Sequence, residues 1–60
     1  MMTWVIVARD PGPSGKEYRM LAVTRDQVAE LLADQRARGR AVHIEDMNGR
    51  RVDDTAFKTK

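Results

Sequence analysis

Residues 24–39 read TRDQVAELLADQRARG and combine a helix start, an apolar stripe and a helix stop. The segment from Thr24 to Gln27 matches a capping box, in which the Thr24 hydroxyl accepts from the Gln27 amide and the Gln27 side chain reaches back to the Thr24 amide. Gly39 suits a left-handed helix stop, so the segment predicts a helix over about residues 25–38. The spacing i, i+3, i+4, i+7 forms one stripe of that helix, made of Val28, Leu31, Leu32 and Gln35.

A β-hairpin is predicted before this helix. Trp4 to Ala8 is a short run rich in β-branched residues, and residues 10–15, with two prolines and two glycines, interrupt it. Tyr18 to Val23 is the next apolar run and alternates as a strand does. The loop between the two runs exceeds the favoured two to five residues, so turn chemistry does not fix the register of this hairpin.

A second hairpin is predicted after the helix. Residues 41–47 form the third expected strand, and the Asn-Gly pair at 48–49 is a strong turn signal that leads into a short strand around residues 50–53. Residues 54–60 offer only Phe57 as an apolar anchor, which predicts a short turn or a frayed tail.

Two registers compete in the second hairpin. A two-residue type I′ turn sets Glu45 opposite Val52. A type I turn with Gly49 in a G1 bulge sets Ile44 opposite Val52 and Glu45 opposite Arg51. We favour the bulged register, because it makes one apolar pair and one charge pair.

The element order is therefore β-β-α-β-β, and the predicted fold class is α+β, with one helix packed on one face of a small, mostly antiparallel sheet. The chain of 60 residues is one domain at most, covering residues 1–60. A helix crossover that joins parallel strands is expected to be right-handed. Strand order stays open, because the second hairpin can pair with either edge of the first.

Composition excludes several classes of protein. With 42% hydrophobic residues and 33% charged residues of both signs, the chain does not resemble a disordered tail. It has no Cys, so disulfide scaffolds and thiolate metal sites are excluded. The longest apolar run, Trp4 to Ala8, is too short for a membrane span or a secretory signal. We expect a soluble cytoplasmic protein without a cofactor and without a membrane partner.

The first hairpin carries apolar residues on both faces, yet one helix covers only one of them. Burying the second face in a partner would stabilise so small a domain materially. We therefore expect an interaction module that forms a homodimer, or binds another protein, through the outer face or edge of this hairpin. The alternative is that these side chains are ordinary exposed residues, or that the Phe57 tail covers them. The expected interface residues are Val5, Val7, Leu21 and Val23.

Residues with catalytic chemistry are few. His43 is the only His, and Glu45 follows it on the same strand face, but a zinc or catalytic site needs further converging ligands. Ser14 lies in a Gly-Pro-rich turn without a phosphate-loop spacing and with no evident base. The acids Asp46, Asp53 and Asp54 suit turn and helix-cap positions. We expect no enzymatic activity.

Basic residues gather in the second half of the chain. Residues 36–60 carry seven basic and four acidic side chains, whereas residues 1–35 carry four and five. An alternative function is therefore weak binding of nucleic acid or another anionic partner by arginines that grip phosphates. The arginines expected to do so form a rim where the helix ends and the second hairpin turns: Arg36, Arg38, Arg40, Arg50 and Arg51.

Two features weaken that alternative. The solvent side of the helix carries Asp26, Glu30 and Asp34, which would repel a phosphate backbone. Arginines at the end of a helix complement its dipole, and Asp34 and Arg38 have the spacing of a favourable ion pair.

Overall fold

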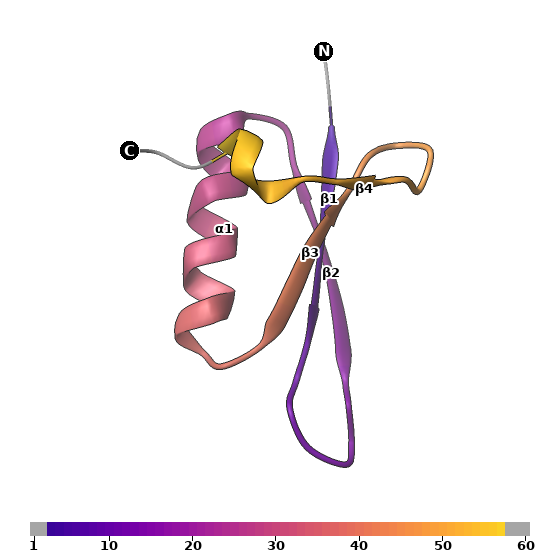
Figure 1. The fold of residues 1–60 in the computed structure, drawn as a ribbon, viewed down its shortest axis with the longest axis vertical. Helices are drawn as coiled ribbons and strands as arrows, with labels where there is room; N and C mark the ends of the chain where they lie inside the picture. Colours follow the sequence, from indigo (N-terminus) through magenta and orange to yellow (C-terminus); the bar gives the residue numbers. More distant parts are fainter. Residues whose placement is uncertain (1–2, 58–60) are drawn as a thin grey trace.

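The chain folds into a four-stranded sheet with one helix on one of its faces (Figure 1). The computed structural model describes residues 3–57. The predicted α+β class and the predicted β-β-α-β-β order are confirmed. The elements are β1 (Trp4–Arg9), β2 (Glu17–Ala22), α1 (Arg25–Ala37), β3 (Ala41–Glu45), β4 (Arg51–Val52) and the 3₁₀ helix η1 (Asp54–Phe57).

The strand order, which the sequence left open, is β2-β1-β3-β4. β1 is central and pairs antiparallel with both β2 and β3, and β4 pairs antiparallel with the outer side of β3. Because β2 and β3 are both antiparallel to β1, they run parallel to each other on either side of it. The helix α1 connects them across the covered face of the sheet.

The start of α1 follows the predicted capping box in one of its two hydrogen bonds. The Gln27 amide donates to the Thr24 hydroxyl at 3.1 Å. The Gln27 side chain, however, accepts from the Val23 amide at 2.8 Å, so the predicted contact with the Thr24 amide was wrong. β2 ends at Ala22, one residue before the predicted end of the strand.

The end of α1 confirms the predicted left-handed stop. Gly39 has a φ of +78°, and its amide donates to the Arg36 carbonyl at 2.9 Å. The Arg40 amide donates to the Gln35 carbonyl at 3.1 Å. These two bonds form a Schellman motif, which satisfies the last carbonyls of the helix and directs the chain into β3.

The second hairpin adopts the bulged register that the sequence favoured. Ile44 pairs with Val52 and Glu45 with Arg51, and Gly49 has a φ of +82°. The type I turn with a left-handed Gly therefore sets which residues of β4 face the helix.

Both strands of this hairpin are shorter than predicted, because neighbouring residues are used for turns. The Asp46 carboxylate accepts from the Asn48 and Arg50 amides at 2.8 and 2.9 Å, so β3 ends at Glu45. Asp53 accepts from the Thr55 amide at 3.0 Å and caps η1. The turn and cap positions predicted for Asp46 and Asp53 are thereby confirmed.

The core lies between α1 and the sheet, with Phe57 at one end. The Phe57 ring packs edge-on against Trp4, with centroids 5.2 Å apart and planes at 83°. The tail therefore closes the helix side of the sheet, and the alternative in which Phe57 covers the outer face was wrong. Residues 58–60 of the predicted tail lie outside the described residues. The core cluster consists of Trp4, Ile6, Ala22, Val28, Leu32, Ile44 and Phe57.

Candidate interaction surface

The face of the sheet opposite α1 is formed by the odd-numbered residues of the strands. Val7 sits at its centre, paired with Arg19 on β2 and His43 on β3. The next row toward the start of β1 sets Val5 between Leu21 and Glu45. This open face therefore combines aliphatic and charged side chains.

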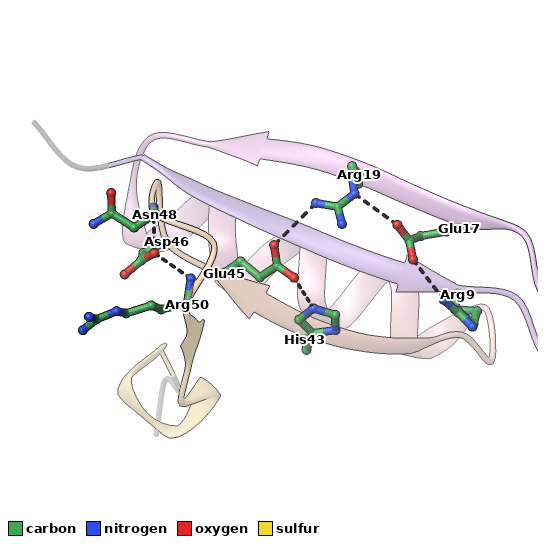
Figure 2. A network of polar contacts seen from close by, with 8 residues as sticks. All are labelled: Arg9, Glu17, Arg19, His43, Glu45, Asp46, Asn48 and Arg50. Carbon is green, nitrogen blue, oxygen red and sulfur yellow. Dashed lines mark hydrogen bonds and ion pairs between the residues drawn. The ribbon is translucent and has the colours of Figure 1, made fainter.

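A chain of ion pairs crosses the open face from β1 through β2 to β3 (Figure 2). Glu17 binds Arg9 at 3.1 Å and Arg19 at 3.0 Å through its two carboxylate oxygens. Arg19 also lies 3.4 Å from Glu45, whose second oxygen is 2.8 Å from His43 Nε2. Each acid in this chain therefore has two basic neighbours.

This arrangement stabilises the ionised form of both acids. The hydrogen bond from His43, followed by the charge of Arg19, lowers the pKa of Glu45 against an opposing effect of desolvation. Hydrogen bonds from Arg9 and Arg19 lower the pKa of Glu17 in the same way. Charge on the open face is thus largely compensated within the monomer.

The outer edge of β2 has no partner strand among residues 3–57, because β2 pairs only with β1. The Asp10 amide donates to the Lys16 carbonyl at 2.8 Å, which marks residues 10 and 16 as a hydrogen-bonded pair of the ladder. By the alternation of an antiparallel ladder, the even residues of β2 bond to β1. The amides and carbonyls of Glu17, Arg19 and Leu21 then point outward from the sheet.

The four predicted interface residues differ in exposure. Leu21 is 71% exposed and Val23 is 48% exposed, whereas Val7 is only 3% exposed between its charged neighbours. Val5 is half-buried, and Val23 lies just beyond β2 rather than within it. The structure thus brings Val5, Leu21 and Val23 to one end of the hairpin and leaves Val7 covered.

A groove of about 370 Å³ lies between the exposed end of β2 and α1. Leu21 and Leu31 supply its apolar surface. Gln27, Glu30 and Asp34 supply polar groups from the helix. Sequence reasoning missed this groove, because its two walls come from elements whose relative placement the sequence did not determine.

The arginines predicted as a basic rim are not one surface. Arg36 forms an ion pair with Asp54, and Arg38 forms the predicted ion pair with Asp34 at 3.1 Å. Arg40 binds Asp10 at 2.5 Å. Three of the five are thus already paired with acids of the same chain.

Arg50 and Arg51 lie where the turn after β3 enters β4, whereas Arg40 directly precedes the start of β3. The predicted Glu45–Arg51 register is confirmed, but Glu45 binds Arg19 and His43 instead of Arg51. Neither Arg50 nor Arg51 forms an ion pair within residues 3–57, and Figure 2 shows the Arg50 side chain directed away from the ion-pair chain.

Arg40 belongs to a polar cluster that the sequence analysis did not find. Its guanidinium lies 4.2 Å from the centroid of the Tyr18 ring and donates to Gln35 at 2.6 Å. Tyr18 donates to the second oxygen of Asp10 at 3.1 Å. The hydrogen bond from Arg40, followed in the same direction by that from Tyr18, lowers the pKa of Asp10 despite desolvation. The buried Gln35 in the helix stripe was the one sequence signal of a polar partner at this end.

The residues considered for catalysis do not come together in one site in the described part of the chain. Within residues 3–57, no group of three or more His, Asp or Glu side chains is placed to hold a metal ion. His43 binds Glu45, and Ser14 is exposed in the loop between β1 and β2. No helix in the described part of the chain is long and apolar enough to cross a membrane.

Comparison of the chain with protein-family models, with curated proteins and with solved structures finds no match.

Proposed function

We propose that the protein is a non-enzymatic interaction module that self-associates through the outer edge of β2 and the apolar residues at its end. The observation that carries this proposal is Leu21, which is 71% exposed on a strand edge with no partner among residues 3–57. Such an edge presents a row of free backbone groups to another strand. Val5 and Val23 extend the apolar area at the same end of the hairpin.

The size of the domain supports the same proposal. A chain of 60 residues buries a small core, and its stability is correspondingly marginal. Removing Leu21 and Val23 from water adds favourable burial at about 25 cal/mol per Å². Val7 adds little to such an interface, because it is already covered within the monomer.

Light scattering over a concentration series tests this function. We expect the mass to rise from monomer to dimer, and Leu21→Lys to weaken dimerisation at least about tenfold, which corresponds to about 1.4 kcal/mol. Ala37→Lys is the matched control, because it adds the same charge at an exposed helix residue outside the groove. Monomer mass at every concentration, or equal losses in both variants, would contradict the proposal.

Arg50 and Arg51 support a second candidate, weak binding of nucleic acid or another anionic partner. Both side chains are exposed and make no ion pair in the described part of the chain. An amide NMR titration with a short mixed-sequence oligonucleotide tests it at low and then moderate salt. Shifts around the β3–β4 turn that disappear as salt rises would favour this candidate, because phosphate contacts weaken steeply with salt. An apolar dimer would persist.

A further inference from the structure

We infer that the occupant of the β2 edge is a second copy of this chain, with its β2 antiparallel to the first and with Lys16 of each copy in the groove of the other. This inference rests on the proposed self-association and specifies its geometry. Three observations carry it: the charge order along β2, the side of the sheet that Lys16 faces, and the acids in the groove.

The charges along the edge of β2 are complementary to themselves in an antiparallel pairing. A two-fold axis at Tyr18 sets Glu17 opposite Arg19 of the partner subunit, and by symmetry Arg19 opposite Glu17 of the partner subunit. Cross-strand pairs of opposite charge are favourable. An axis at Arg19 would instead set two arginines against each other, and an axis at Met20 would set Arg19 against an aliphatic side chain.

The same register uses the free backbone groups of the edge. The amides and carbonyls that point outward belong to the odd residues, as the Asp10–Lys16 bond establishes for this ladder. Glu17 and Arg19 are both odd, so in this register they form the hydrogen-bonded pairs between the two copies. The four-stranded sheets then join into one continuous sheet.

Lys16 lies on the helix side of the sheet. Its Nζ is 5.2 Å from the centroid of the Tyr18 ring, and Tyr18 is on the same side as Met20, which packs against the core. In the proposed register, Lys16 of the partner subunit lies opposite Met20 and therefore beside Leu21, where the groove opens.

The groove has the chemistry to receive an ammonium group on an aliphatic stem. Leu31 provides apolar contact for the stem, β2 borders the groove at Leu21, and Glu30 and Asp34 provide carboxylates one helical turn apart. Glu30 forms no ion pair within residues 3–57, whereas Asp34 already binds Arg38. Glu30 is thus the acid that Lys16 of the second copy would bind.

Amide hydrogen exchange by NMR at low and high protein concentration tests the strand pairing. We expect exchange at Glu17 and Arg19 to slow at least about tenfold with dimerisation. Exchange at Tyr18 and Met20 should change much less, because their amides already bond to β1. A dimer that Leu21→Lys weakens, but that lacks this odd-even pattern, would overturn the inference and leave self-association through the apolar end of β2 standing. Monomer mass throughout would overturn both.

Charge reversal tests the groove. We expect Lys16→Glu and Glu30→Lys each to weaken dimerisation about tenfold or more, and the two changes combined in one chain to restore it, because each copy then offers the reversed pair. Asp26→Lys is the matched control, since Asp26 is an exposed acid of the same helix outside the groove. Equal losses from Glu30→Lys and Asp26→Lys, or no recovery in the combined variant, would contradict the placement of Lys16.

Discussion

The two faces of the sheet come from alternate residues of the same strands, yet they are stabilised differently. On the covered face, Ile6 and Ile44 are fully buried and belong to the core cluster with Val28 of α1. On the open face, Val7 is only 3% exposed although no helix lies over it, and charged side chains flank it on both neighbouring strands. Burial alone therefore does not tell which face is the core. Apolar packing against α1 buries the covered face, whereas ion-paired side chains flank the buried Val7 on the open face.

The largest effect should come from the covered face. Ile44→Ala removes a fully buried side chain, and we expect it to lower the free energy of unfolding by about 2–5 kcal/mol. A domain of this size has only about 3–9 kcal/mol in total. Urea denaturation at a concentration where the protein is monomeric measures this loss. The control Leu21→Ala should stay within about 0.5 kcal/mol, because Leu21 is 71% exposed. Equal losses in the two variants would remove the distinction between the faces.

A smaller loss is expected from the open face. Val7→Ala deletes two buried methyl groups, which predicts a loss of about 1–2 kcal/mol in the same denaturation experiment. This value lies between those of Ile44→Ala and Leu21→Ala. A loss no larger than that of Leu21→Ala would show that the flanking charged side chains do not keep water from Val7 in solution.

The turn between β3 and β4 sets which face of the sheet each residue of β4 lies on. Straining this turn should lower the free energy of unfolding by less than Val7→Ala does. Gly49 has a φ of +82°, so Gly49→Ala strains the bulged turn, and we expect a loss of about 1 kcal/mol. Gly12→Ala is the control, since Gly12 also has a positive φ but lies in the longer loop between β1 and β2. That loop has more freedom to adjust, so its loss should be smaller. A larger loss of stability in Gly12→Ala than in Gly49→Ala would contradict the expectation that the turn at Gly49 constrains the fold more than the loop does.

Most of the fold was predictable from local patterns. The helix stop at Gly39 and the bulge at Gly49 both follow from residues adjacent in sequence, and both are confirmed. Element ends were less predictable, because single side chains can decide them: the Asp46 carboxylate accepts from two amides of the turn, and β3 ends just before it.

The candidate surface was predictable only in part. The alternation of apolar residues along the first hairpin identified the face that the helix does not cover, with Val5, Val7 and Leu21. It could not show which of these side chains the neighbouring strands would cover. That outcome depends on strand order, since His43 reaches the side of Val7 only because β3 pairs with β1. The contact of Arg40 with Asp10 has the same cause, because it joins residues 30 positions apart.

The smallest effect in this series should be the response of the open face to acid. The pKa of Glu45 is lowered in the folded protein, chiefly by the hydrogen bond from His43, whereas in the unfolded chain it is about 4.3. A carboxylate with a depressed folded pKa stabilises the fold above its unfolded pKa, and this stabilisation is lost as the pH falls through the folded pKa. We therefore expect stability to decline below about pH 4, with Glu17 acting in the same direction.

Glu45→Gln isolates this contribution, because the amide keeps the shape of the side chain but does not ionise. We expect the variant to be slightly less stable than the parent at pH 7 and to lose less stability between neutral and acidic pH, as measured by thermal denaturation across a pH series. Asp10 contributes equally to the pH dependence of stability in both proteins, since its lowered pKa arises chiefly from the hydrogen bond of Arg40, which is outside the ion-pair chain of the open face. Glu30→Gln, compared at a concentration where the protein is monomeric, is the control, because Glu30 lies on α1 outside the ion-pair chain. Identical pH profiles for the parent and Glu45→Gln would show that the ion pairs of the open face shield Val7 without stabilising the fold electrostatically. The two faces would then differ in what covers them but not in how their stability responds to pH.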